Sequence, residues 1–174
     1  MGNKAKAKQT MKAAGVPVVP GSDGILDGPK DALEKANQMG YPIMLKASAG
    51  GGGRGMRLVK RESEVIAAYK SANQESQNAF GNGDIYIEKF IENPRHIEVQ
   101  VLADTHGNII HLGERECSIQ RRHQKLIEES PSPIVDEDTR KKIGEAAVAG
   151  ARAVNYVGVG TIEFLMDKQK NFYF

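Results

Sequence analysis

Hydrophobic and polar residues alternate along two stretches of the chain, and this alternation predicts β-strands. In residues 96–101 the apolar positions are Ile97, Val99 and Val101, and polar residues occupy the positions between them. Residues 84–90 alternate in the same way. Because successive side chains of a strand point to opposite faces, each strand is expected to bury one face and to keep the other polar.

Short apolar runs, and residues that start or stop helices, predict the remaining elements. Strands are expected at residues 42–47, 56–59, 108–114, 161–167 and 172–174. Helices are expected at residues 3–14, 29–39, 62–80 and 137–154. Gly15 and Gly40 can end the first two helices, and Asp136 can cap the last. Residues 104–107 form a hairpin turn, and residues 117–129 carry too much charge for a core strand.

Composition and charge exclude several classes of protein. The chain has 174 residues, enough for one sizeable domain or two small ones. Its net charge of +2 is too small to indicate nucleic acid by itself. The single cysteine, Cys117, rules out an intrachain disulfide framework and a zinc cluster, and it favours a reducing compartment. No apolar run is long enough to cross a bilayer, and the start lacks a signal-peptide core.

The most unusual stretch is a glycine loop between two predicted strands. Gly50, Gly52 and Gly55 satisfy the pattern G-x-G-x-x-G. A dinucleotide-binding turn would need a helix directly afterwards, but residues 56–59 read as a strand. No Gly-Lys-Ser/Thr follows, so the P-loop pattern fails as well. The loop is therefore interpreted as a flap that lays backbone N–H groups over phosphates, with a flexible hairpin tip as the alternative.

Charged residues near this loop suit the binding of an anion and a metal. Lys46 ends the strand that leads into the loop and can meet phosphate oxygens. Residues 120–125 contain three cations and a histidine, which suit a triphosphate or a small anion; a basic patch for RNA is the alternative. Glu163 stands in an apolar strand, where it either binds magnesium or points to solvent. His96 and Glu98 share the polar face of their strand.

Three longer motifs resemble the signatures of biotin carboxylases. They are the glycine loop of residues 46–56, residues 88–100 and residues 114–125, in the same order and at the same spacing as in that family. The resemblance implies an α+β fold of the ATP-grasp type. It implies a linker helix at residues 1–17, a small lid subdomain at 18–90 and part of a larger antiparallel palm subdomain at 91–174, cut short.

The resemblance also implies roles for individual residues. Nucleotide contacts are expected from Lys4, Lys46, Gly51, Gly52, Gly53, Glu88, Lys89, His96, Gln120 and His123. Three of the implied residues belong to the catalytic group: Lys125 faces bicarbonate and the transferred phosphate, His123 meets the terminal phosphates, and Glu163 binds the metal. Such a charge-dense phosphoryl transfer needs a metal and cations rather than a covalent nucleophile.

The cofactors, substrates and partners follow from the same resemblance. They are ATP with Mg²⁺ (Mn²⁺ as the alternative metal), bicarbonate, and biotin on a carrier protein, with a carboxyltransferase as a further partner. The full enzyme is expected to be cytoplasmic and homodimeric, and to supply malonyl-CoA for fatty acid synthesis. Pyruvate or propionyl-CoA carboxylases, another ATP-grasp ligase, and a non-enzymatic nucleotide- or RNA-binding module are the alternatives.

The end of the chain at an apolar strand, residues 172–174, suggests a truncation. The family's second metal carboxylate would begin just past Phe174. We therefore expect the 174-residue chain not to carboxylate biotin by itself and to bind ATP at most weakly.

Overall fold

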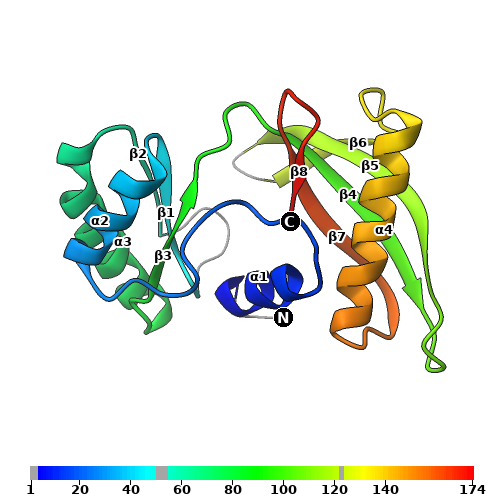
Figure 1. The fold of residues 1–174 in the computed structure, drawn as a ribbon, viewed down its shortest axis with the longest axis horizontal. Helices are drawn as coiled ribbons and strands as arrows, with labels where there is room; N and C mark the ends of the chain where they lie inside the picture. The colour runs from blue at the N-terminus through cyan, green and yellow to red at the C-terminus, as the bar shows by residue number, and fades with distance from the viewer. Residues whose placement is uncertain (1–3, 50–54, 122–123) are drawn as a thin grey trace. The chain divides into compact units, whose positions relative to one another are not determined.

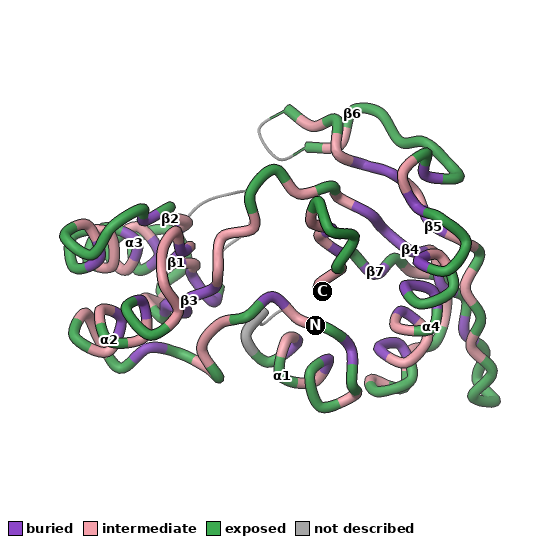
Figure 2. The backbone as a smooth tube through the Cα atoms, turned by 45° about the horizontal axis from the view of Figure 1, so that its top comes forward, coloured by how far each residue is buried: buried purple, intermediate pink, exposed green. Residues whose placement is uncertain are grey.

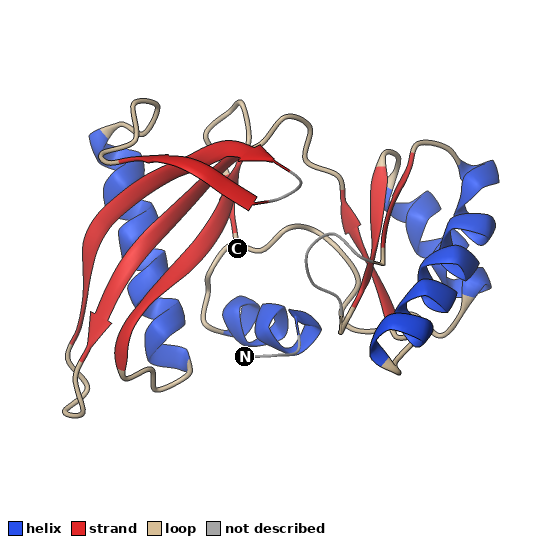
Figure 3. Cartoon of the chain, turned by 180° about the vertical axis from the view of Figure 1, so that it is seen from behind, coloured by secondary structure: helices blue, strands red, loops and turns tan. Residues whose placement is uncertain are grey.

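The structure is a computed structural model that describes residues 4–49, 55–121 and 124–174, with side chains from Lys6 onward. Its residues divide into two compact units, Met1–Gln9 with Val19–Phe90 and Thr10–Val18 with Ile91–Phe174. Each unit contains an antiparallel sheet and helices that pack on it (Figures 1 and 3). None of the described helices has the length and apolar character that a membrane span requires.

The first unit is a three-stranded sheet with helices on one face. Its strands β1 (Ile43–Ala47), β2 (Met56–Val59) and β3 (Ile85–Lys89) lie in the order β2-β1-β3. The face is covered by α2 (Pro29–Met39) and α3 (Val65–Phe80), which follows the short 3₁₀ helix η1 (Glu62–Glu64). Apolar residues of the strands and helices, together with Leu26 from the loop before α2, fill the core between them: Leu26, Ala32, Ala36, Ile43, Leu45, Ala47, Val59, Val65, Ala72, Ile85 and Ile87.

The antiparallel pair β1–β2 brings the two ends of the glycine loop together. Lys46 pairs with Met56 in the register, and the N–H of Ala47 donates to the carbonyl of Gly55 over 2.9 Å. Gly55 has a φ of 68°, and a Cβ atom added there would collide with the Cβ of Ala47. Glycine is therefore required at this position both by conformation and by close approach.

The second unit is a five-stranded sheet crossed by one long helix. The strand order is β6-β5-β4-β7-β8, built from β4 (Arg95–Ala103), β5 (Ile109–Arg121), β6 (Gln124–Glu129), β7 (Gly158–Met166) and β8 (Phe172–Tyr173). The helix α4 (Glu137–Ala153) packs mainly on β5 and β4. Helix α1 (Lys4–Ala13) is divided between the units, and its Met11 belongs to the core of this one.

The two faces of this second sheet differ in character. Ile97, Val99 and Val101 point toward α4 and are fully buried, as the colours of Figure 2 show for the strands beneath the helix. The alternate residues of β4, among them His96 and Glu98, therefore lie on the face turned away from the helix. That polar face is where most of the candidate site residues of the unit lie.

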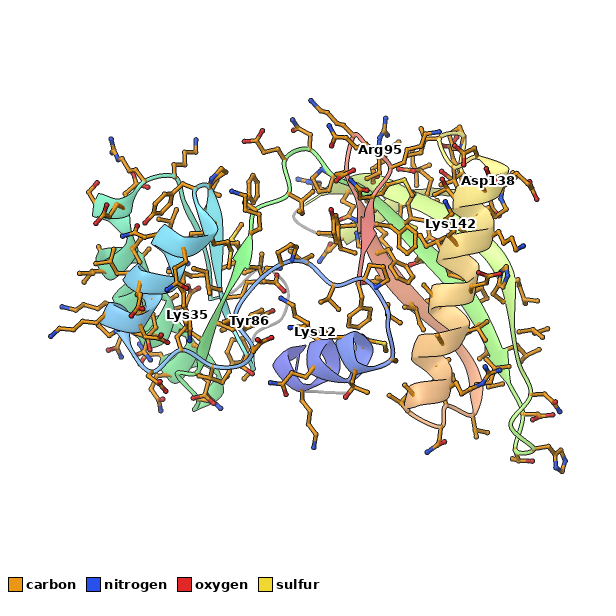
Figure 4. The ribbon with its side chains drawn as sticks, in the orientation of Figure 1. Lys12, Lys35, Tyr86, Arg95, Asp138 and Lys142 are labelled. Carbon is orange, nitrogen blue, oxygen red and sulfur yellow. The ribbon has the colours of Figure 1, made fainter. Side chains whose placement is uncertain are left out.

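Most predicted elements are confirmed, and two stretches differ in part from the expectation. Part of residues 117–129 does belong to a core strand, because β5 continues through a fully buried Cys117 to Arg121. The described remainder, residues 124–129, is the edge strand β6 and not a core strand. An edge strand keeps its charged side chains in solvent, so charge there does not oppose strand formation. In β3 the polar positions are not exposed: Tyr86, labelled in Figure 4, and Glu88 are both buried.

Phe164 is the largest fully buried side chain of the second unit and packs edge-to-face on Phe172, with ring centroids 5.6 Å apart. Phe164→Ala is expected to lower the free energy of unfolding by about 3–5 kcal/mol, because it leaves a cavity in the core. Urea unfolding followed by circular dichroism measures this change. The control Leu112→Ala removes a side chain that is 62% exposed, so an equal loss in both variants would contradict the assignment of the core.

Candidate functional site

In the first unit a buried carboxylate holds two ammonium groups. Glu88, on β3, is only 5% exposed. Its Oε2 lies 2.5 Å from Nζ of Lys46, and its Oε1 lies 3.0 Å from Nζ of Lys8. Because two cations share one carboxylate, this cluster keeps an excess of positive charge, as a phosphate-binding group should.

The two lysines also set the ionisation of Glu88. Burial raises the pKa of the carboxyl, but the charges of Lys46 and Lys8 outweigh burial and hold the pKa below its ordinary value. The carboxylate is therefore ionised at neutral pH and keeps both ammonium groups in place. Lys8 reaches Glu88 from helix α1, within the part of that helix that belongs to the first unit.

Lys89 is separate from this cluster. Its Nζ donates to the carbonyls of Gly40 and Tyr41, 3.1 and 3.0 Å away, at the end of α2. Its backbone N–H donates to the carbonyl of Pro20 over 2.7 Å. Both donors of Lys89 therefore have protein partners in this structure.

In the second unit three charged side chains form a row across neighbouring strands. The register places Glu98 of β4 opposite Arg115 of β5 on one side and opposite Glu163 of β7 on the other. Arg115 donates from Nε and Nη2 to Oε1 of Glu98, the Nε bond being 2.6 Å long. Glu98 is only 2% exposed, whereas the side chain of Glu163 is 53% exposed.

Lys125 closes this row from β6. Its Nζ contacts Oε2 of Glu98 and also lies 2.6 Å from Oε1 of Glu163. Burial lowers the pKa of Lys125, but the hydrogen bonds to Glu163 and Glu98 outweigh burial and raise the pKa. Lys125 is thus a fixed, protonated cation between two carboxylates, suited to meet a developing negative charge but not to take up a proton.

His96 and Gln120 are neighbours in the same unit. Nε2 of Gln120 lies 2.7 Å from Nδ1 of His96 and also donates to the carbonyl of Cys117. Since an amide nitrogen only donates, Nδ1 accepts, and we assign the ring proton to Nε2. That atom is buried and lies 3.6 Å from Oε2 of Glu163, so the histidine faces the same carboxylate as Lys125.

These neighbours explain the acidity of Glu163. The adjacent His96 ring and the Lys125 ammonium together lower the pKa of the carboxyl to about 2, against the effect of partial burial. Glu98 is similar: burial raises its pKa, but hydrogen bonds from Lys125 and Arg115 bring the pKa below its ordinary value. Both carboxylates are charged at neutral pH.

Glu163 fits the requirements of a magnesium ligand on a nucleotide. It is an ionised, half-exposed oxygen ligand, and Mg²⁺ bound to phosphates needs only one or two protein carboxylates. A second group, Glu98, Cys117 and Glu128, has ligand atoms within 4.8 Å of one another. It does not fit a metal: Arg115 already pairs with both carboxylates, and burial together with Glu98 and Glu128 raises the pKa of the thiol to about 11.

The structure thus joins several residues that the sequence analysis named separately. Lys46 meets Glu88 in the first unit; His96, Gln120, Lys125 and Glu163 lie together in the second. The side chain of Lys4, the glycines Gly51, Gly52 and Gly53, and His123 lie outside the described residues.

Sequence reasoning missed two residues, Lys8 and Arg115, and named Glu98 only as a member of a polar face. The alternation of β4 gave a signal for Glu98, and Arg115 lies within the third motif. Lys8 gave no signal, because nothing in a lysine-rich helix distinguishes the side chain that reaches Glu88.

Comparison with known proteins is consistent with this arrangement. A family model described as "Carbamoyl-phosphate synthase L chain, ATP binding domain" matches residues 3–174. The chain belongs to this ATP-binding domain family. Within it, a biotin carboxylase from Nostoc sp. is 59% identical over 174 residues, which are 100% of this chain and 39% of that protein.

The chain is also similar to solved structures of biotin carboxylases. A biotin carboxylase–β-γ-ATP complex from Campylobacter jejuni matches with a TM-score of 0.96 and 59% identity, over 100% of this chain and 39% of that one. The biotin carboxylase domain dimer of Hydrogenobacter thermophilus 2-oxoglutarate carboxylase, in complex with MgADP, ADP and bicarbonate, matches with a TM-score of 0.94 and 53% identity, over 100% and 38%. The α+β fold is therefore the ATP-grasp fold of biotin carboxylases, and the chain spans about two fifths of their length.

The low pKa of Glu163 predicts a loss of stability in acid. Between pH 4.5 and about 2 the unfolded carboxyl binds a proton that the folded carboxyl does not, so stability falls as the pH is lowered through this window. Thermal unfolding measured from pH 6 to pH 2 should show a shallower fall for Glu163→Gln than for the wild type. Glu145→Gln, at an exposed position of α4, is the control; a Glu163→Gln profile parallel to the wild type would contradict the network.

Proposed function

We propose that this chain is the MgATP-binding part of a biotin carboxylase, an enzyme that uses ATP and bicarbonate to carboxylate biotin on a carrier protein. The observation that carries the proposal is the bridge of Lys125 between Glu98 and Glu163. It provides a fixed cation beside a metal-binding carboxylate, the pair of groups that a phosphoryl transfer to a small anion requires.

The charges of the two clusters suit the two parts of MgATP. In the first unit Lys46 and Lys8 exceed the charge of Glu88, and they would bind phosphate oxygens. In the second unit the carboxylates of Glu98, Glu128 and Glu163 exceed the charges of Arg115 and Lys125. That excess favours a divalent cation, for which Glu163 is the most exposed of the three carboxylates.

The remaining roles follow the same division. Bound at Glu163, Mg²⁺ would neutralise phosphate charge and polarise the transferring group. Lys125 would hold bicarbonate and the transferred phosphate, while His96 and Gln120 would line the nucleotide pocket. The Gly51, Gly52 and Gly53 amides, Lys4, Lys89 and His123 complete the proposed nucleotide contacts, and we propose residues 18–90 as the lid and 91–174 as part of the palm.

The wider assignment rests on the relatives. We propose a cytoplasmic, homodimeric enzyme that acts with a biotin carboxyl carrier protein and a carboxyltransferase in forming malonyl-CoA for fatty acid synthesis. The similarity to the biotin carboxylase domain of a 2-oxoglutarate carboxylase, at 53% identity, shows that several carboxylases share this domain. Pyruvate and propionyl-CoA carboxylases therefore stand as alternative sources of the chain.

Calorimetric titration of ATP into the purified chain, with and without Mg²⁺, tests nucleotide binding. Lys46→Ala is expected to weaken ATP binding about tenfold or more, since it removes a charge-assisted contact to phosphate. Lys70→Ala removes an exposed lysine of α3 and serves as the control with unchanged affinity. Equal affinities in the two variants would contradict a phosphate role for Lys46.

The same titration examines the metal site. Glu163→Gln is expected to remove most of the difference between ATP binding with and without Mg²⁺, because the variant lacks the ionised ligand. A Mg²⁺ effect of the wild-type size in Glu163→Gln would contradict metal binding there. Nucleotide binding that is independent of Mg²⁺ in the wild type, together with RNA affinity that falls steeply with salt, would favour the RNA-binding alternative.

A further inference from the structure

Arg115 contacts three polar side chains on two neighbouring strands. Its guanidinium donates to Glu98 from Nε and Nη2 and to Oε1 of Gln100 from Nη1 over 2.9 Å. Its Nε also lies 3.2 Å from Oε2 of Glu128. Contacts to β4 and β6 therefore fix the guanidinium in position and orientation, and a planar group held in this way can fix a carboxylate in turn.

The carboxylate that it fixes has an unusual electrostatic position. Glu98 is buried, and its neighbour in the register on β7 is another carboxylate, Glu163. Like charges directly opposite each other on adjacent strands repel, and a buried charge must be paired. One cation cannot both neutralise the buried Glu98 and offset its repulsion with Glu163, and the structure supplies two cations. Arg115 donates to Oε1 of Glu98, and Lys125 donates to Oε2.

Removal of Arg115 would change the ion pairing of Lys125. The ammonium would become the main counter-ion of a buried carboxylate and would be drawn toward both oxygens of Glu98. It would then leave its place beside Glu163, where it now lies 2.6 Å from Oε1. The guanidinium thus keeps Lys125 shared between two carboxylates instead of bound to one.

We propose that Arg115 is a positioning residue that acts through Glu98 to hold the Lys125 ammonium at the place where phosphate is transferred. The inference rests on the proposed function for the meaning of that place, but the positioning itself depends only on contacts within the second unit. Arg115 touches neither nucleotide nor bicarbonate in this proposal, so its substitution should affect the chemical step more than nucleotide binding.

The chain offers a matched control on the opposite face of the same sheet. Arg140 of α4 pairs with Glu114 of β5, with bonds of 3.1 and 3.0 Å from Nε to the two oxygens. Each arginine side chain is 27% exposed, and each partner glutamate is nearly fully buried. Arg115→Met and Arg140→Met therefore break equivalent ion pairs, and only the first contacts the Lys125 network.

The first measurement follows the ammonium directly. In the purified chain labelled with ¹⁵N-lysine, a held ammonium exchanges its protons slowly and gives a ¹H–¹⁵N signal in the cold, which Lys125→Arg assigns. We expect the Lys125 signal to shift or vanish in Arg115→Met, to return in part in Arg115→Lys, and to stay unchanged in Arg140→Met. An unchanged signal in Arg115→Met would overturn the proposal, as would equal shifts in the two methionine variants.

Coupling through Glu98 gives a second criterion in the same spectra. Because Arg115 acts through that carboxylate, adding Arg115→Met to Glu98→Gln should not move the Lys125 signal further. An additional shift of the size seen for Arg115→Met alone would show that Arg115 affects Lys125 independently of Glu98. That result would overturn the proposed mechanism of positioning.

The final measurement is bicarbonate-dependent ATP hydrolysis by the complete enzyme that contains this chain. Arg115→Met should lower kcat roughly 100-fold while KM for ATP stays within about threefold, because a small misplacement of a catalytic group affects mainly the chemical step. Arg115→Lys should recover part of kcat, and Arg140→Met should retain wild-type kcat below its melting temperature. A wild-type kcat in Arg115→Met would overturn the proposal. If the wild-type enzyme lacked bicarbonate-dependent ATP hydrolysis, the proposed function would be overturned, and the ¹H–¹⁵N spectra alone would test the positioning of Lys125.

Discussion

Two carboxylates, Glu98 and Glu163, lie directly opposite each other on neighbouring strands, and cations from β5 and β6 offset their repulsion. Lys125 lies between them, and Arg115 supports the more buried carboxylate from the other side. The resulting network places a protonated amine beside an exposed, strongly acidic carboxylate. In the proposed function this network links the pairing of the strands to the binding of a metal and an anion, because the cation offsets the repulsion between the two carboxylates.

The same principle recurs in both units. Glu88 in the first unit and Glu114 under α4 are buried, and each is paired with cations from another element. Such pairs contribute little net stability, because desolvation offsets much of the attraction, but they fix the position of the cation with precision. Glu114 with Arg140 fastens a helix to a sheet, whereas Glu88 and Glu98 hold lysines that phosphate could reach.

The sequence was sufficient for most of the elements and for the family, and insufficient for the contacts. Alternation along β4 and the cap at Asp136 were read correctly because they depend on neighbouring residues; the Asp136 side chain accepts from the N–H of Thr139. The burial of Glu88 and the pairing of Arg115 with Glu98 depend on which strands become neighbours, over 17 positions for the latter pair. Local patterns carry no such information, so the sequence did not identify Lys8 and Arg115. It also did not show that the charged stretch begins inside a core strand, β5, at the buried Cys117.

Hydrogen–deuterium exchange of the chain, with and without saturating MgATP, tests most directly whether residues of both units bind the nucleotide. If the proposed function is correct, exchange becomes slower around Lys46 and Glu88 in the first unit and around His96, Lys125 and Glu163 in the second. The second effect is then lost when Mg²⁺ is removed. Protection confined to one unit, or to segments distant from these residues, would contradict the proposed function.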